Sequence, residues 1–173
     1  MNILQQFKPI TTFVFGIDGV LTDGRLLVLE NGELLSQMNI KDEYALQIAL
    51  KKGYRIIFIS GRNPVGIRIR LNKSGISNTF LEVQNKKEKL EEIAIQYKLD
   101  WKEILFMGHD LADSSSLKKT GISCSPADAA VEIKQQCKYV SPFKGGEGCV
   151  RDVIEKVLKL NEDWEPDGSM NSG

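Results

Sequence analysis

The sequence lacks the features that would assign it to several broad classes. Its apolar runs are short pieces such as residues 55–60, so we expect no membrane span. Lys and Arg together number 23, as do Asp and Glu, and no net charge favours binding to nucleic acid or an anionic membrane. Residues 1–9 lack the basic start, apolar stretch and cleavage site of a signal peptide. We therefore expect a cytoplasmic protein.

Cysteine and histidine are scarce as well. The three cysteines, Cys124, Cys137 and Cys149, are odd in number and follow no spacing typical of metal sites. This argues against a disulfide framework and predicts buried, reduced thiols. His109 is the one histidine in the chain.

Strand-length apolar runs alternate with segments of helical period, which predicts an α/β fold with a doubly wound parallel sheet. We expect one domain over residues 1–160, with a hairpin at about 25–38 and no large cap. Residues 161–173 are predicted to be a loosely held tail. Predicted strands are residues 13–17, 55–59, 79–82, 104–107, 122–124 and 139–140; predicted helices are 41–52, 64–75, 86–97, 113–119, 127–136 and 148–160.

The hairpin is predicted from two apolar runs, residues 26–29 and 34–38, separated by Glu30-Asn31-Gly32-Glu33. Asn-Gly between apolar runs is a strong hairpin signal, and in its commonest turn both residues need positive φ.

The most informative segment is residues 13–24, Phe-Val-Phe-Gly-Ile-Asp-Gly-Val-Leu-Thr-Asp-Gly. It reads as an apolar strand that runs into a loop carrying Asp18 and Asp23. In α/β enzymes, carboxylates at the carboxyl end of a strand are typical of phosphotransfer sites.

This segment resembles the first motif of the haloacid dehalogenase superfamily, Asp-x-Asp-Gly-x-Leu/Thr. The resemblance implies that the first Asp attacks phosphorus and the second, Asp18 here, handles protons. The attacking position is Gly16, and a glycine cannot form an aspartyl-phosphate. The same segment therefore indicates a phosphatase family and questions the activity.

Three further segments resemble the superfamily motifs, in the expected order. Ser60-Gly61-Arg62 follows a predicted strand and is similar to the second motif, which holds phosphoryl oxygens. Lys86 opens a predicted helix, as the third-motif lysine does. Residues 108–113, Gly-His-Asp-Leu-Ala-Asp, resemble the acidic fourth motif, with His109 where the family has a metal-binding Asp.

The closer resemblance is to the small-cap subgroup typified by 3-deoxy-D-manno-octulosonate 8-phosphate (KDO 8-phosphate) phosphatases. It rests on residues 18–24, the hairpin after them, Asn39-Ile40-Lys41-Asp42, Ala127-Asp128-Ala129 and Gly145 to Arg151. These segments are collinear over about residues 11–160. The resemblance implies a homotetramer joined through the hairpins, a small phosphorylated sugar acid as ligand, and Mg²⁺ as cofactor.

The departures from the family pattern change the expected chemistry. Of the family's Mg²⁺ ligands, two carboxylates are replaced, by Gly16 and His109, and we expect Mg²⁺ to bind poorly to what is left at Asp18 and Asp110. Imidazole suits Zn²⁺, Ni²⁺ or Cu²⁺ better. Ser60, Arg62 and Lys86 survive and face fewer carboxylates, so a pocket that binds a sugar phosphate without cleaving it is our first hypothesis.

Two other functions stay open on the sequence alone. One is an active sugar-acid phosphatase that uses water activated by Asp18 and a metal at His109. The other is a scaffold that binds no phosphate.

Each candidate residue also has a plain structural interpretation. Gly16 could serve a bend or tight packing, and His109 could be solvated or hydrogen-bonded. Ser60 could cap a helix, Lys86 could lie on a solvated face, and Asp110 and Asp113 could be helix caps.

Overall fold

Six short strands form one fully parallel sheet in the computed structural model, which describes residues 2–166. Their order is β5-β4-β1-β6-β7-β8, with β1 in register with β4 and β6 on either side. This is the doubly wound architecture expected from the sequence. The strands are β1 (Thr12–Phe15), β4 (Arg55–Ile59), β5 (Thr79–Phe80), β6 (Ile104–Met107), β7 (Ile122–Ser125) and β8 (Tyr139–Val140).

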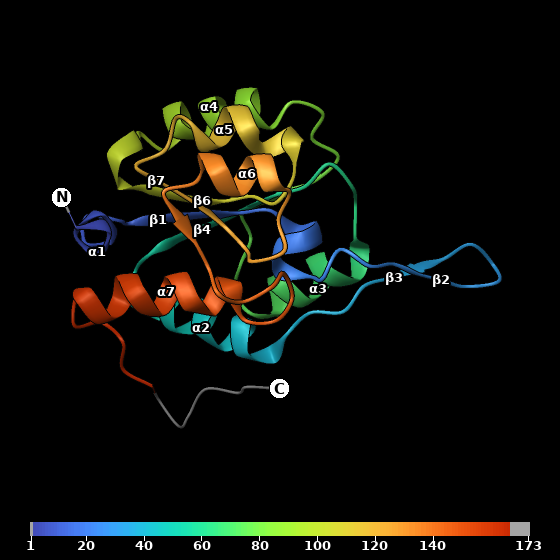
Figure 1. Cartoon of the computed structure of the whole chain (residues 1–173). Helices are drawn as coiled ribbons and strands as arrows, with labels where there is room; N and C mark the ends of the chain where they lie inside the picture. The colour runs from blue at the N-terminus through green and yellow to red at the C-terminus, as the bar shows by residue number, and fades with distance from the viewer. Residues whose placement is uncertain (1, 167–173) are drawn as a thin grey trace.

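Helices cover both faces of the sheet (Figure 1): α4, α5 and α6 lie on one face, and α2, α3 and α7 on the other. Within residues 2–166, none of the helices is both long and apolar enough to cross a bilayer. Their bounds are α1 (Ile3–Phe7), α2 (Ile40–Lys51), α3 (Val65–Lys73), α4 (Lys86–Gln96), α5 (Ser114–Leu117), α6 (Val131–Gln136) and α7 (Cys149–Leu160). Short turns η1 (Ile17–Leu21), η2 (Trp101–Glu103) and η3 (Leu111–Asp113) adjoin the strands.

The position of β1 in the middle of the sheet explains why Phe13, Val14 and Phe15 are all apolar. Phe13 and Phe15 pack into the core beneath α2 and α7, whereas Val14 packs into the core beneath α4 and α6. All three side chains are fully buried. A parallel strand with helices on both faces has no polar side, so continuous apolar residues are required.

Several element boundaries differ from the prediction, two of them near the candidate motifs, and one short helix was not predicted. β1 ends at Phe15, before Gly16, so the glycine lies in the loop and not in the strand. α6 begins at Val131 and not at residue 127, because Ala127 and the residues after it form a loop. The helix α1 was missed; Asn2 caps it by accepting a hydrogen bond from the Leu4 N–H.

The hairpin consists of β2 (Leu27–Val28) and β3 (Leu34–Leu35) and extends away from the rest of the domain (Figure 1). The prediction that both turn residues adopt positive φ was wrong: Gly32 has φ +83°, whereas Asn31 does not. The Gly32 N–H donates to Leu29 O and the Leu29 N–H to Glu33 O, which makes a longer turn closed by one left-handed glycine.

The thiols are free, as predicted. Cys124 and Cys149 are buried, whereas Cys137 is only half-buried. Burial raises the pKa of Cys137 to about 11, which keeps the thiol protonated at neutral pH.

The start of the predicted tail is attached to the domain. Asp163 accepts a hydrogen bond from Tyr54 Oη at 2.7 Å, and Glu165 pairs with Lys52. Trp164 packs against the core beside Arg151. The rest of the predicted tail, residues 167–173, lies outside the described residues.

Candidate functional site

The residues singled out from the sequence follow the carboxyl ends of three adjacent strands. Gly16 and Asp18 follow β1, Ser60 and Arg62 follow β4, and residues 108–113 follow β6. Because β4, β1 and β6 are parallel neighbours, these loops meet at one edge of the sheet. The order of the strands therefore brings the predicted site together.

Gly16 is not required by the backbone. Its φ is −71°, which any residue adopts, and its N–H donates to Met107 O at 3.1 Å. A Cβ built on Gly16 would meet Val20 Cγ2 at 3.4 Å and no atom closer, which is an ordinary contact. The structure therefore gives no steric reason for glycine at the position where the related family motif has its nucleophile.

Asp18 and Arg62 form a two-pronged ion pair across the loops after β1 and β4. Arg62 Nε donates to Asp18 Oδ2 and Arg62 Nη2 to Asp18 Oδ1, each at 2.7 Å. The hydrogen bonds to Asp18 raise the pKa of Arg62. Ser60 is buried, and its Oγ accepts the Arg62 N–H at 3.1 Å, which fixes the turn through Gly61. Both oxygens of the Asp18 carboxylate are thus engaged by the protein itself.

Lys86 and Asp113 form the second ion pair of this edge. Lys86 Nζ lies 2.7 Å from Asp113 Oδ1, and the Asp113 side chain is fully buried. Asp113 Oδ2 also accepts the N–H of His109 at 3.0 Å and of Asp110 at 3.3 Å. Burial opposes the charged form, but the contacts from His109 and the charge of Lys86 outweigh it and hold the pKa of Asp113 below its usual range.

Asp113, not Asp110, is the fourth-motif carboxylate that faces Lys86. Asp110 is exposed and its Oδ1 accepts the Leu111 N–H, which is the capping role that the sequence left open. A Cβ on Gly108 would lie 2.5 Å from Asp113 Cβ, so glycine is needed there to seat the buried carboxylate. The sequence carried a signal for this arrangement, because Gly108 directly follows an apolar strand and lies five residues before Asp113.

The His109 imidazole lies against the segment that follows β1 and carries Asp18 and Gly19, called the first loop here. Gly19 has φ +77°, and a Cβ on it would be 2.2 Å from His109 Cδ2. His109 Nδ1 is buried and lies 3.7 Å from Asp113 Oδ2, too far for a hydrogen bond, with no other partner in the described part of the chain. The ring therefore fills space between the Gly19 backbone and the Asp113 carboxylate.

The donor set does not fit Mg²⁺. Hard divalent cations take several oxygen ligands, but Asp18 is held by Arg62 and Asp113 by Lys86. Within residues 2–166, no group of three or more His, Cys, Asp or Glu residues is placed to hold a metal ion.

Two glycines near the end of the domain pack directly on the first loop, a contact that the sequence interpretation missed. A Cβ on Gly145 would lie 2.0 Å from Gly19 O, and one on Gly146 would lie 2.6 Å from Asp23 N. The Gly146 N–H donates to Val20 O at 3.0 Å. Backbone contact with the loop after β1 is what requires glycine at both positions.

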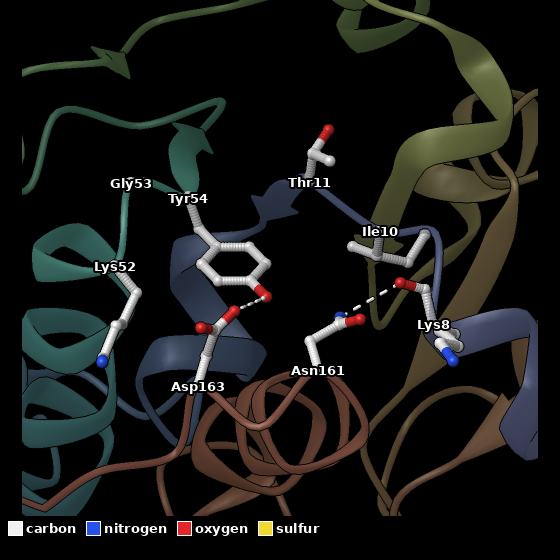
Figure 2. A pocket seen from close by; sticks show the side chains of 8 residues that line it. All are labelled: Lys8, Ile10, Thr11, Lys52, Gly53, Tyr54, Asn161 and Asp163. Carbon is white, nitrogen blue, oxygen red and sulfur yellow. Dashed lines mark hydrogen bonds between the residues drawn. The ribbon is translucent and has the colours of Figure 1, made fainter.

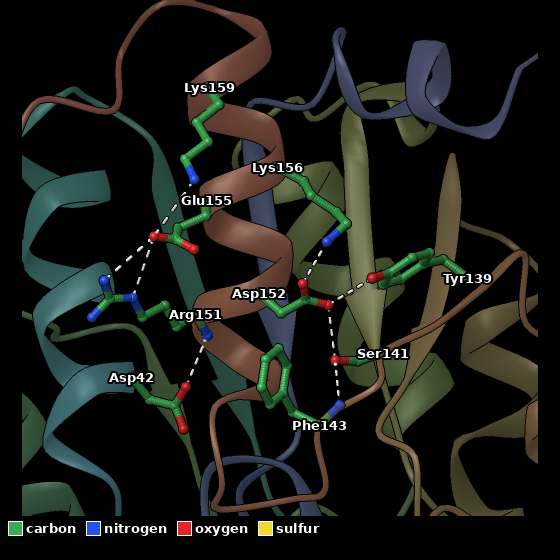
Figure 3. Close-up of polar contacts among 9 residues, drawn as sticks. All are labelled: Asp42, Tyr139, Ser141, Phe143, Arg151, Asp152, Glu155, Lys156 and Lys159. Atoms are coloured by element: carbon green, nitrogen blue, oxygen red, sulfur yellow. Dashed lines mark hydrogen bonds and ion pairs between the residues drawn. The ribbon is translucent and has the colours of Figure 1, made fainter.

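Figure 3 shows Asp152 of α7 in contact with Tyr139 and Ser141, which come just before the glycine loop in the chain. Ser141 Oγ donates to Oδ2 of buried Asp152 at 2.8 Å and accepts the Phe143 N–H at 3.2 Å. Tyr139 Oη donates to the same Asp152 oxygen at 2.7 Å. Asp128 Oδ1 accepts the Gly145 N–H at 2.9 Å, which accounts for the Ala-Asp-Ala segment.

Asp42 holds the other side of the α7 start (Figure 3). It is fully buried, and its Oδ1 accepts the Arg151 N–H at 2.8 Å. Its Oδ2 has no partner among the described residues. Burial, opposed by backbone hydrogen bonds from Arg151 and Gly148, raises the pKa of Asp42 to about 6.

Two cavities lie at opposite ends of the sheet. One, of about 640 Å³, lies between the hairpin and α3; Arg62 lines it, which connects it to the candidate site. The other, of about 420 Å³, is lined by Ile10, Thr11 and Tyr54 at the amino ends of β1 and β4 (Figure 2). The second cavity lies at the amino ends of the strands, whereas the candidate site lies at their carboxyl ends, so the two are separate.

Comparison with known proteins agrees with this geometry. Residues 82–153 match the family described as haloacid dehalogenase-like hydrolase. The chain is 28% identical over 165 residues to the 3-deoxy-D-manno-octulosonate 8-phosphate phosphatase of Escherichia coli K12, which covers 93% of this chain and 88% of the relative.

Two further relatives bear on the site. A Moraxella catarrhalis 3-deoxy-D-manno-octulosonate 8-phosphate phosphatase, solved with magnesium, phosphate and KDO, superposes with a TM-score of 0.88 at 25% identity, covering 91% of each chain. The chain is also 29% identical over 148 residues to N-acylneuraminate cytidylyltransferase A of Danio rerio, covering 84% of this chain. It spans only about a third (34%) of that relative's length. In its fold, in the order of its motifs and in its relatives, the chain is similar to the KDO 8-phosphate phosphatases of the haloacid dehalogenase superfamily.

Proposed function

We propose that this protein is a degenerate member of the family: it retains a pocket for a phosphorylated sugar acid and has lost most or all phosphomonoester hydrolysis. The observation that carries the proposal is Gly16. Its backbone accepts a side chain, and the nearest atom to a Cβ would be 3.4 Å away. Because the backbone leaves room for a Cβ, the absence of the carboxylate is a loss of chemistry and not a demand of the backbone. Loss of a nucleophile in another hydrolase lowers turnover by up to about 10⁶-fold.

The groups that remain suit binding. Arg62 offers a planar fork for a phosphoryl group, and Ser60 and Gly61 form the turn before it. Lys86 adds a second cation at the same edge, although Asp113 already neutralises it. The expectation that these cations face few carboxylates is met only in part, since each has one carboxylate partner.

The test is phosphate release from a panel of sugar-acid phosphates, with Mg²⁺, Mn²⁺ or Zn²⁺. The native protein is compared with the Gly16→Asp/His109→Asp double variant. We expect turnover only from the double variant, because it regains a nucleophile and a metal-facing carboxylate. Turnover by the native protein at an ordinary rate would instead support an active phosphatase with a different nucleophile or metal site.

We further propose that the hairpin joins copies of this chain into a homo-oligomer, a tetramer by analogy with the family. Four apolar side chains of the hairpin are exposed, with exposed fractions from 48% to 65%: Leu27, Val28, Leu34 and Leu35. A two-stranded hairpin is marginal in water by itself, so a partner surface is expected.

Sedimentation velocity tests the assembly. The Leu27→Glu/Leu35→Glu variant should sediment as a smaller species than the native protein, because charge is then buried at the contact. Ile95→Glu is the matched control: Ile95 is 79% exposed on α4, away from the hairpin. Equal effects of both changes would locate the contact elsewhere.

A further inference from the structure

The Asp18–Arg62 pair has the geometry of a bound ligand. Two parallel hydrogen bonds of 2.7 Å join the guanidinium fork to both carboxylate oxygens. A guanidinium takes a phosphoryl group through the same two donors and nearly the same spacing. We propose that the Asp18 carboxylate is an internal occupant of the anion pocket, which a phosphorylated ligand must displace from Arg62. This inference rests on the proposed binding function and adds a regulating residue to it.

Arg62 is the cation at this edge that can change partners. Its side chain is 35% exposed and that of Asp18 is 26% exposed, so solvent reaches both. Ion pairs open to solvent are weak, and an incoming anion can replace one member at small cost. Lys86 is different, because its partner Asp113 is fully buried and also accepts two backbone N–H groups.

The backbone around Arg62 is held firmly, so exchange requires motion of side chains alone. The Arg62 N–H donates to Ser60 Oγ, and Arg62 O accepts the Glu82 N–H at 3.3 Å. Asp18 lies on the first loop, whose next residue, Gly19, is packed against His109. A ligand can therefore take the Arg62 fork while Asp18 turns toward solvent.

The same pair accounts for the poor fit of the site to a hard cation. Of the two Asp positions that open the first motif, Asp18 still carries a carboxylate. Arg62 already donates hydrogen bonds to both of its oxygens. Arg62 therefore supplies positive charge beside Asp18 without needing the ligands that Gly16 and His109 lack.

The test is titration with inorganic phosphate by isothermal calorimetry at fixed ionic strength, pH 7.5, without added metal. Asp18→Asn removes the competing charge and keeps the side-chain shape. We expect it to bind phosphate about tenfold more tightly than the native protein, the effect of one charge-assisted hydrogen bond. Asp18→Ala is the second variant and should show the same direction. Arg62→Gln should abolish binding.

Asp100→Asn is the matched control. It removes one negative charge at an exposed cap of η2, at the amino end of β6, and asparagine caps equally well. Its phosphate affinity should equal that of the native protein. If native and Asp18 variants bind equally tightly, Asp18 is no competitor, and the proposed binding function stands without it. If none of the variants binds phosphate at millimolar concentration, the binding function fails and this inference fails with it.

Discussion

The two ion pairs at the carboxyl edge of the sheet have the same length but differ in how deeply they are buried. Lys86–Asp113 and Arg62–Asp18 are both closed at 2.7 Å. Asp113 is fully buried and shares its oxygens with two backbone donors, whereas Asp18 is partly exposed and has Arg62 as its one partner within residues 2–166. Burial decides what each pair does: the first is part of the structure, and the second is open to exchange. A loss of carboxylates elsewhere in the motif leaves the first pair untouched.

The largest expected effect comes from breaking the buried pair. Lys86→Met leaves the Asp113 carboxylate buried without its cation, which costs about 3 kcal/mol of unfolding free energy. Urea unfolding measures the loss. Lys89→Met is the control on the same helix, since its pair with Glu92 is exposed, and it should change stability by less than about 0.5 kcal/mol. Equal losses in the two variants would contradict the buried role of Lys86–Asp113.

A third carboxylate sharpens the comparison, because Asp42 is buried without a facing lysine. The pKa of Asp42 in the folded state is about 6, whereas its ordinary pKa, expected in the unfolded chain, is 3.8. Between these values the folded state holds more protons, so the stability that Asp42 contributes falls as pH rises through the window. The full change is at most about 3 kcal/mol.

Urea unfolding of Asp42→Asn at pH 4.5 and pH 7.5 measures this pH-dependent contribution to the free energy of unfolding. At pH 7.5 the variant should be more stable than the native protein. At pH 4.5 its advantage in stability should be smaller or absent. Asp113 has the opposite sign: its lowered pKa gives stability above the unfolded value that is lost at more acidic pH. A native-minus-variant difference that is the same at both pH values would show that Asp42 does not titrate in this window.

Most of the fold followed from the sequence, because buried parallel strands must be apolar and their order placed the three motifs at one edge. The ion-pair partners at that edge could not be predicted from the sequence. Arg62 and Asp18 are 44 positions apart, and their contact depends on the register of β1 against β4, Phe15 beside Phe58. The capping of α1 by Asn2 was readable, but a five-residue helix has too few periodic positions to stand out.

Gly145 also escaped the sequence interpretation, since nothing local distinguishes a turn glycine from one in contact with a distant loop. Gly145→Ala should push the first loop outward, because its Cβ would overlap Gly19 O. We expect a loss of about 2 kcal/mol of unfolding free energy, typical of overpacking. We also expect tighter phosphate binding, because a loop pushed outward takes the competing Asp18 carboxylate away from Arg62. Gly66→Ala is the control: it lies within α3 with no atom near its Cβ, and alanine favours helix. Unchanged phosphate affinity in Gly145→Ala would separate the glycine loop from the site.

The smallest expected effect is on folding stability when the exposed pair is broken. A double-mutant cycle of Asp18→Asn and Arg62→Gln in urea should give a coupling energy below about 1 kcal/mol, because water and salt screen a pair with these exposures. The coupling should shrink further between 0.05 and 0.5 M salt, unlike the effect of Lys86→Met. A salt-insensitive coupling as large as the Lys86 effect would make Asp18–Arg62 a second structural pair, and a ligand could then no longer displace it at small cost.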